Sequence, residues 1–388
     1  SPEFALEAAK VFAGNGIKAF LFDELRPTPE LSFAVRHLKA AAGIVVTASH
    51  NPKEYNGYKV YGGDGGQLPV EASNEVISYI SKIEDMTKIR IMEKDEAIEK
   101  GLLKIIGKEV DDEYIAKLKT LSVNPELAAE IGSTFKIVYT PLHGSGNKPV
   151  RRILDEIGFK NVLVVKEQEL PDSEFSTVKS PNPEEKEAFK IAIELAEKEN
   201  VDLIIGTDPD SDRVGIVVRN KEGEYVALTG NQTGCLLLEY ILSQKKQRGE
   251  LPSNGFVVKT IVTTELARII AEAYNIELVE VLTGFKFIGE KIKQLDEFGD
   301  KKYLFGFEES YGYLAGTFAR DKDAVVASML IAEMAAYYKS RGLTLYDGLI
   351  EILEKYGYTL EGITSFTLKG KDGVEKIKSA LTTLREKQ

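Results

Sequence analysis

The chain has 388 residues, of which 43% are hydrophobic and 29% are charged, and its formal net charge is −11. This composition is ordinary for a soluble globular protein, so it excludes a collagen, a small disulfide-stabilised scaffold and a chain disordered throughout. At roughly 150 residues per domain the length predicts two or three domains. The acidic balance argues against a general nucleic-acid binder, which needs a broad basic surface.

Two further properties narrow the class of protein. No apolar run reaches about 18 residues, the length of a membrane-spanning helix, and the best candidate, residues 324–338, contains Glu333. The single cysteine, Cys235, cannot close an internal disulfide, which favours a reducing compartment such as the cytoplasm. The chain opens with Ser-Pro-Glu-Phe and no methionine, and we expect this tetrapeptide to be a remnant of cloning.

Strand-length apolar runs alternate with helical patterns along the chain. The first third predicts helices over 6–15 and 30–41, strands over 18–22 and 43–47, a two-proline loop over 26–29, and a solvated helix and linker over 82–108. The middle predicts strands over 135–139, 161–165, 202–206 and 214–219, with helices over 147–157 and 183–199. The last third predicts helices over 230–243, 264–274, 285–297 and 323–341, with strands over 255–261, 278–282 and 303–307. This alternation indicates α/β units with largely parallel sheets.

An acidic loop follows the apolar run that ends at residue 207. Its sequence is Asp-Pro-Asp-Ser-Asp-Arg over residues 208–213, with carboxylates at Asp208, Asp210 and Asp212. In an extended segment such alternating residues face one side, so three carboxylates would converge and require a cation. Oxygen ligands suit Mg²⁺. An EF-hand is excluded because its glycine and glutamate positions hold Arg213 and Arg219; the remaining alternative is a solvated Asp-rich turn.

A second loop, Thr-Ala-Ser-His-Asn-Pro over residues 47–52, also follows a predicted strand. A polar surface turn is one interpretation, because Asn-Pro is a turn dipeptide. The functional interpretation makes Ser49 a nucleophile or phosphoryl carrier, with His50 or Lys59 handling protons or phosphate. A hydrolase triad is disfavoured, since no Gly-x-Ser-x-Gly elbow is present and the chain has only three histidines.

Together these loops resemble those of the α-D-phosphohexomutase family, the phosphoglucomutases and phosphomannomutases, and most of all its bacterial phosphoglucomutases. Residues 47–52 resemble the family's phosphoserine loop, and residues 208–213 its metal loop, usually written Asp-Gly-Asp-Gly-Asp-Arg. Residues 306–312, Gly-Phe-Glu-Glu-Ser-Tyr-Gly, resemble its sugar-recognition loop. Thr-Gly-Phe-Lys at 283–286 and Thr-Pro-Leu-His-Gly at 140–144 match further loops. Five motifs in the family's order make the resemblance specific.

The resemblance implies an intramolecular phosphotransferase that interconverts glucose 1-phosphate and glucose 6-phosphate. A phosphoserine and a glucose 1,6-bisphosphate intermediate, which is also the activator, would carry the phosphoryl group. Mg²⁺ would be the cofactor and a small sugar phosphate the partner, with no nucleic acid or membrane; oligomeric state stays open. The implied catalytic residues are Ser49, His50, Lys59 and Arg213; the implied metal ligands are Ser49, Asp208, Asp210 and Asp212; the implied substrate-binding residues are Thr283, Gly284, Lys286, Glu308, Ser310 and Arg320.

The resemblance also implies an architecture of successive three-layer α/β domains with mixed, largely parallel sheets. The expected parts are an N-terminally incomplete phosphoserine domain at 5–122, a metal-binding domain at 123–228 and a sugar-recognition domain at 229–356. Residues 357–388 would begin a phosphate-binding domain, most of which is missing together with its Arg-x-Ser-Gly-Thr loop. We therefore expect the chain to be truncated at both ends, to bind metal, and to show much reduced turnover.

Alternatives remain within and outside the family. No histidine follows Ser310 in the sugar loop, which weakens the case for dual glucose and mannose specificity and favours glucose, with phosphomannomutase or phosphopentomutase activity open. For Arg320 and Lys322 a solvated helix start is an equal alternative to phosphate binding. Two hypotheses lie outside the family. One is a haloacid-dehalogenase-like phosphatase, in which Asp208 would be the nucleophile, and the other is a non-catalytic module that binds metal or sugar phosphate.

Overall fold

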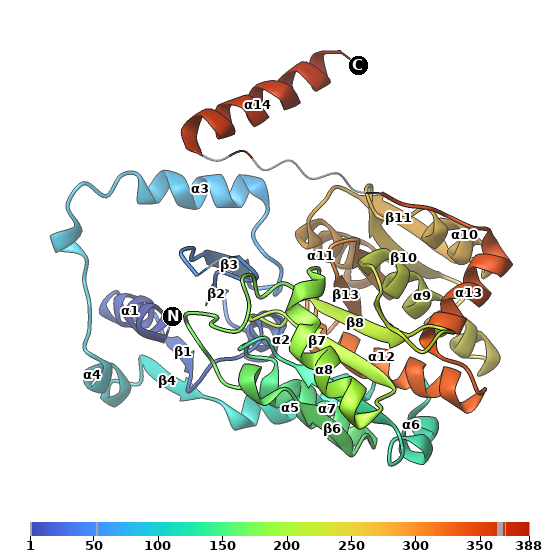
Figure 1. Ribbon diagram of the computed structural model, residues 1–388. Helices are drawn as coiled ribbons and strands as arrows, with labels where there is room; N and C mark the ends of the chain where they lie inside the picture. Colours follow the sequence, from blue (N-terminus) through green and yellow to red (C-terminus); the bar gives the residue numbers. More distant parts are fainter. Residues whose placement is uncertain (1, 52, 363–367, 369, 388) are drawn as a thin grey trace. The chain divides into compact units, whose positions relative to one another are not determined.

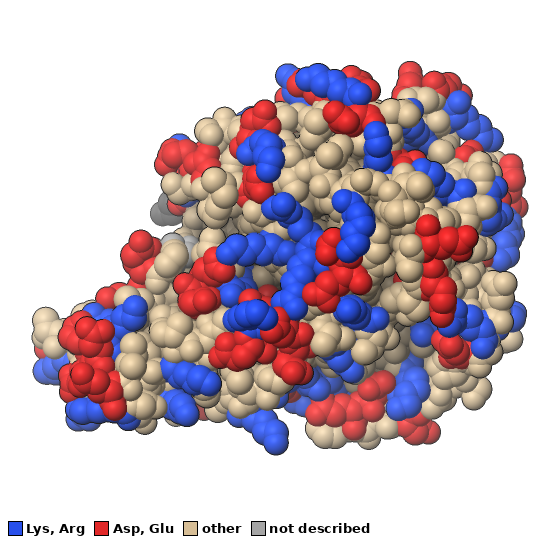
Figure 2. Space-filling model, turned by 90° about the horizontal axis from the view of Figure 1, so that it is seen from below, with Lys and Arg blue, Asp and Glu red and all other residues tan. Residues whose placement is uncertain are grey.

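The computed structural model describes residues 2–51, 53–362, 368 and 370–387. It divides the chain into two units, residues 1–357 and 358–388, and the second contains the helix α14 (Gly370–Glu386). Figure 1 shows the course of the chain, and Figure 2 shows Lys and Arg side chains intermixed with Asp and Glu on the face that it presents. Among the described residues, no helix is long and apolar enough to cross a membrane.

The amino-terminal part contains two separate pairs of strands. β1 (Ala19–Phe22) pairs in parallel with β4 (Leu103–Ile106), and β2 (Ala42–Val46) pairs antiparallel with β3 (Tyr58–Gly62). The other elements are α1 (Pro2–Gly14), α2 (Thr28–His37), α3 (Val70–Ile80), the short 3₁₀ helix η1 (Met86–Lys88), α4 (Lys94–Glu99) and α5 (Lys108–Lys119). The prediction of only a solvated helix and linker over 82–108 was wrong, because Leu103 and Ile106 bury their side chains where β4 pairs with β1.

The central sheet has the strand order β6-β5-β7-β8-β9. Its strands are β5 (Lys136–Thr140), β6 (Asn161–Val164), β7 (Leu203–Thr207), β8 (Val214–Arg219) and β9 (Tyr225–Ala227). The first three are parallel, and β8 and β9 run antiparallel. Helices are α6 (Pro125–Ile131), α7 (Asn147–Ile157), the 3₁₀ helices η2 (Lys166–Gln168) and η3 (Lys186–Phe189), and α8 (Lys190–Glu199).

Side chains alternate between the two faces of this sheet. On β7, Leu203 and Ile205 join the core shared with α7, whereas Ile204 joins a second core that includes Ala192 of α8. Helices on both faces of a sheet give the three layers expected (Figure 1). The predicted helix over 183–199 was wrong in its first part, where η3 precedes α8 and places the Phe189 ring against Gly206.

The third sheet has the order β11-β10-β12-β13. Its strands are β10 (Gly255–Thr260), β11 (Glu277–Val281), β12 (Lys302–Glu308) and β13 (Gly312–Ala315), of which only β13 is antiparallel to its neighbour. Helices are α9 (Gly230–Gln247), α10 (Leu266–Ala273), α11 (Phe285–Ile292) with its π-helical extension η4 (Lys293–Glu297), α12 (Ala324–Ser340) and α13 (Leu345–Tyr356).

Helix α12 is buried on nearly every side, because it packs against α6, α7, α9 and α13 as well as β13. Its apolar composition, which gave the longest apolar run in the sequence, therefore belongs to a core helix. Asp323 caps its first turn and accepts hydrogen bonds from the amides of Val325 and Val326 at 2.8 and 3.0 Å. The hydroxyl of Tyr114 also donates to Asp323, at 2.7 Å.

Burial raises the pKa of Asp323 to about 6 from an ordinary 3.8. A raised carboxyl pKa means that this group's contribution to stability is full below its unfolded pKa and is lost as the pH rises through the folded pKa. Because asparagine resembles the protonated form, we expect Asp323→Asn to gain up to about 3 kcal/mol relative to the native chain between about pH 4 and pH 7.5. Urea denaturation of both chains across this range checks it, and a constant difference would contradict it.

Candidate active site

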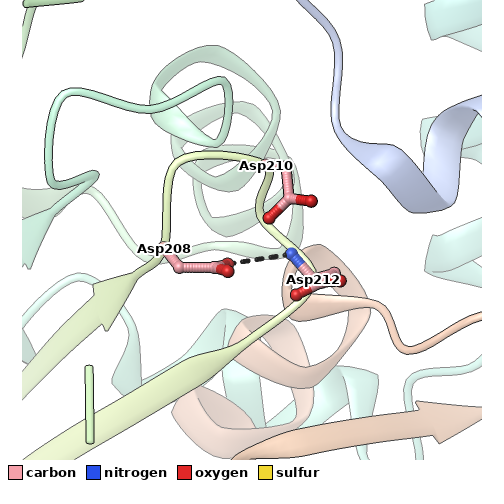
Figure 3. Close-up of side chains that lie close together, drawn as sticks. All are labelled: Asp208, Asp210 and Asp212. Atoms are coloured by element: carbon pink, nitrogen blue, oxygen red, sulfur yellow. Dashed lines mark hydrogen bonds between the residues drawn. The ribbon is translucent and has the colours of Figure 1, made fainter. Parts of the chain in front are cut away.

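The acidic loop lies at the carboxyl end of β7, between β7 and β8. Figure 3 shows the side chains of Asp208, Asp210 and Asp212 gathered there, and one carboxylate oxygen of each lies within 4.8 Å of the others. All three are at most 5% exposed. Hydrogen bonds within the loop stabilise its conformation: the amides of Asp212 and Arg213 donate to Asp208 Oδ1 at 3.1 and 2.9 Å.

The carboxylate oxygens of the triad are suitable ligands for a hard divalent cation. Among the described residues, Asp210 Oδ1 and Asp212 Oδ1 are buried oxygens with no hydrogen-bond donor. Burial, together with Asp212 and Asp210, raises the pKa of Asp208 well above its usual range. Buried carboxylates without enough donors are unfavourable unless a cation compensates them, and oxygen-only ligation is what Mg²⁺ prefers.

Two lysines reach the same carboxylates from other parts of the chain. Lys59 Nζ, from β3, lies 3.1 Å from Asp210 Oδ2, and Lys322 Nζ lies 2.8 Å from Asp212 Oδ2. Burial alone would raise the pKa of Asp212, but Lys322, Lys59 and Arg213 outweigh it and lower that pKa. Lys322 is thus one of the site's charges and not part of a solvated helix start, the alternative that its sequence context left open.

The serine loop meets the acidic loop, although the two are far apart in sequence. Ser49 lies beyond the end of β2 with φ at +53°, a left-handed conformation that is uncommon for a residue with a side chain. Its amide donates to Thr47 Oγ1 at 2.8 Å, and its hydroxyl donates to Asp208 Oδ2 at 3.4 Å. His50 Nδ1 lies 3.2 Å from Ser49 Oγ. Burial, aided by Arg213, lowers the pKa of His50 to about 4, so the ring is neutral near pH 7.

Apart from Arg320, the residues expected to bind substrate lie at or just beyond the carboxyl ends of β11 and β12. Glu308 ends β12 and is buried, and its Oε1 accepts a hydrogen bond from the amide of Gly284 at 2.9 Å. Gly284 adopts φ of +122°, which favours glycine. This bond joins the loop that carries Thr283 and Lys286 to the hairpin that carries Ser310. Thr283 is exposed, whereas Lys286 and Ser310 are half-buried.

Backbone contacts join the acidic loop to the sugar-recognition hairpin. Arg213 forms an isolated antiparallel bridge with Gly312, and the amide of Val214 donates to the carbonyl of Tyr311 at 3.1 Å. The amide of Ala324, at the start of α12, donates to the carbonyl of Ser211 at 3.1 Å. The serine, acidic and sugar loops are therefore brought together by direct contacts.

The two arginines implied by the resemblance, Arg213 and Arg320, lie in different surroundings. Arg213 is the last residue of the acidic loop, and its guanidinium pairs with Glu184. Arg320 is not brought to this cluster: it is only 2% exposed, and its guanidinium donates to the carbonyl of Thr317 at 2.6 Å and to Glu297 at 3.0 Å. The alternative of a solvated helix start for Arg320 was also wrong, since it is buried.

One residue in close contact with the triad, Thr28, was not predicted from the sequence. The amide and the hydroxyl of Thr28, at the start of α2, donate to the carbonyl oxygen and to Oδ2 of Asp210. The Pro-Thr-Pro sequence at 27–29, which predicted only a loop, was the available signal, since proline is common at the start of a helix.

Comparisons with known proteins show which family the chain resembles. Models of the phosphoglucomutase/phosphomannomutase alpha/beta/alpha domains I, II and III match residues 1–87, 112–223 and 229–356. The phosphoglucomutase of Staphylococcus epidermidis is 42% identical over 386 residues, which are 99% of this chain and 68% of that protein. The phosphoglucomutase of Staphylococcus aureus strain MSSA476 is 41% identical over 385 residues, which are 99% of this chain and 67% of that protein.

Solved structures show the same fold. A putative phosphomannomutase from Thermus thermophilus superposes with a TM-score of 0.72 at 26% identity, covering 91% of this chain and 72% of that one. An Aspergillus fumigatus N-acetylphosphoglucosamine mutase, solved in complex with GlcNAc-6P and magnesium, has a TM-score of 0.53 at 15% identity, covering 92% of this chain and 83% of that one. The fold and the relatives together define an enzyme of the isomerase and phosphotransferase class. The chain belongs to the phosphoglucomutase/phosphomannomutase family, and the expected α/β fold class is confirmed.

Proposed function

We propose that this chain carries the phosphoglucomutase reaction, the interconversion of glucose 1-phosphate and glucose 6-phosphate, with Ser49 as the phosphoryl carrier. The observation that carries the proposal is the contact between Ser49 and Asp208, two residues 159 positions apart, beside a buried aspartate triad. The names of the staphylococcal relatives support glucose as the sugar. We further propose the domain ranges 5–122, 123–228, 229–356 and 357–388, and a cytoplasmic location.

Each residue has a chemical role in this proposal. Asp208, Asp210, Asp212 and phosphorylated Ser49 would hold Mg²⁺, which supplies neutralisation of the charge on the transferring phosphoryl group. Neutral His50 can hold the proton of the Ser49 hydroxyl, since its Nδ1 lies 3.2 Å away. Burial would lower the pKa of Lys59, but Asp210 and Asp212 outweigh it and raise that pKa, so Lys59 keeps a positive charge that can neutralise phosphate. Arg213 adds positive charge beside the same loop.

The substrate would lie against the third sheet. Glu308 accepts hydrogen bonds from hydroxyl groups, and Ser310 can both donate and accept, so this pair suits adjacent sugar hydroxyls. Lys286 would neutralise a phosphate, and Thr283 and Gly284 would line the same loop. We do not include Arg320 among the binding residues, because it is already held by Glu297 and Thr317. Glucose 1,6-bisphosphate would be both the intermediate and the activator.

The test is a coupled assay of glucose 6-phosphate formation from glucose 1-phosphate, with a catalytic amount of glucose 1,6-bisphosphate. We expect turnover to depend on Mg²⁺ and to fall by at least about 100-fold after metal removal with EDTA, because charge neutralisation is the metal's main contribution. Faster turnover of mannose 1-phosphate or ribose 1-phosphate would contradict the sugar assignment. Binding of the sugar phosphates without any turnover, also by a chain that includes the whole expected phosphate-binding domain, would favour a non-catalytic module.

A further inference from the structure

Thr28 occupies a conformationally restricted position between two prolines. It is the first residue of α2, and its amide is one of the donors at a helix start that have no partner within the helix. Pro27 and Pro29 carry no amide hydrogen. The amide of Thr28 instead donates to the carbonyl oxygen of Asp210 at 2.8 Å, across 182 residues of sequence.

The side chain of Thr28 makes a second bond to the same aspartate. Its hydroxyl donates to Asp210 Oδ2 at 3.1 Å, and the Thr28 side chain is completely buried. The Asp210 Oδ2 atom also accepts from Lys59 at 3.1 Å. With Oδ2 occupied by two donors, the torsion of the carboxylate is restrained, and Oδ1 is left buried without a donor among the described residues. An oxygen presented in this way is available to a cation.

We propose that Thr28 is a positioning residue that orients Asp210 for metal binding, a role that rests on the proposed function. Metal ligands are commonly oriented by hydrogen bonds from outside the ligand set, and loss of such a bond weakens metal affinity. The contact between Thr28 and Asp210 also fixes the position of α2 relative to the acidic loop. Thr28 lies on α2, which packs against β2, the strand that precedes the serine loop, whereas Asp210 belongs to the loop after β7. The Thr28 hydroxyl that orients Asp210 therefore also helps to fix the position of Ser49 relative to the triad.

The alternative is that Thr28 only adds stability where the two parts meet. Thr28→Val separates these two roles, because it removes the hydroxyl but keeps the shape and the amide, whereas Thr28→Ser keeps the hydroxyl. Thr140→Val is the matched control: Thr140 is also completely buried, and its hydroxyl donates to Gln168 Oε1 at 2.6 Å rather than to a residue of the triad. The thermal stability of each variant is measured in EDTA, so that metal binding does not contribute to it.

The readout is Mn²⁺ affinity, measured from the electron paramagnetic resonance signal of free Mn²⁺ without substrate. We expect Thr28→Val to weaken Mn²⁺ binding by about 10-fold, and Thr28→Ser and Thr140→Val to stay within about 3-fold of the native chain. Native affinity in Thr28→Val, or equal weakening in Thr28→Val and Thr140→Val, would overturn the positioning role.

An Asp210→Asn variant distinguishes failure of the proposed role of Thr28 from failure of the metal site itself. If Asp210→Asn loses Mn²⁺ affinity and Thr28→Val does not, the role of Thr28 fails while the metal site stands. If Asp210→Asn binds Mn²⁺ as tightly as the native chain, the metal site itself fails, and the role of Thr28 fails with it.

Discussion

The Ser49→Ala variant is expected to lose turnover of glucose 1-phosphate by at least about 1,000-fold, equivalent to about 4 kcal/mol of transition-state stabilisation. The reason is that this variant removes the proposed phosphoryl carrier, because Ser49 Oγ lies 3.4 Å from Asp208 Oδ2 and 3.2 Å from His50 Nδ1. The coupled assay measures the loss. Ser340→Ala, at the end of α12, removes a hydroxyl that donates only within its helix, and this control should keep the native rate.

Phosphoryl labelling identifies the carrier directly. After incubation with labelled glucose 1,6-bisphosphate, we expect one phosphoryl group on the peptide that contains Ser49, and none in Ser49→Ala. A phosphoserine ester resists hydroxylamine, whereas an acyl phosphate on Asp208 would be cleaved by it. Label that hydroxylamine releases would therefore contradict the Ser49 assignment and favour the haloacid-dehalogenase alternative.

The residues of the site that could be predicted are those whose chemistry is contained in a short segment. The alternation at Asp208, Asp210 and Asp212 follows a buried strand, so local geometry is enough to predict that the carboxylates converge, and the structure places them within 4.8 Å. Some buried strands were also predicted from apolar runs: the strand predicted over 202–206 corresponds to β7 (Leu203–Thr207). Contact of the serine loop with the triad followed from the family resemblance and not from local pattern.

Contacts between distant segments could not be predicted in the same way. Lys322 and Arg320 are two residues apart beside α12, yet Lys322 pairs with Asp212 while Arg320 turns to Glu297. Both are positively charged residues in a polar stretch, and only tertiary packing distinguishes them. β4 was missed for a related reason: its burial comes from pairing with β1, more than 80 residues earlier in the chain.

Glu333 is the clearest example of a residue whose importance lies in its distant partners. It lies in the middle of α12 and is completely buried. Its Oε1 accepts hydrogen bonds from the amides of Val123 and Asn124 at 2.8 and 2.9 Å and from the hydroxyl of Tyr240 at 2.8 Å, and its Oε2 accepts from the hydroxyl of Ser122. One carboxylate thus ties α12 and α9 to the segment between α5 and α6.

Glu333→Leu is expected to lower the free energy of unfolding by about 3–5 kcal/mol, because it leaves two amides and two hydroxyls without their acceptor in a buried or half-buried setting. Glu333→Gln should cost about 1 kcal/mol, since the amide keeps one acceptor oxygen and its nitrogen can donate to the Ser122 hydroxyl. Urea denaturation followed by circular dichroism measures both, as a lower midpoint at unchanged slope.

The matched control for this charge removal is Glu351→Leu on α13. The Glu351 side chain is 42% exposed and pairs with Arg341 at 2.8 Å, so we expect its loss to cost less than about 1 kcal/mol. Because Glu333 holds residues 122–124, which join the part bearing Ser49 to the part bearing the triad, limited proteolysis should cut this segment faster in Glu333→Leu than in Glu351→Leu. Equal midpoints and equal cleavage rates in the two variants would show that the segment is held in place by its other contacts.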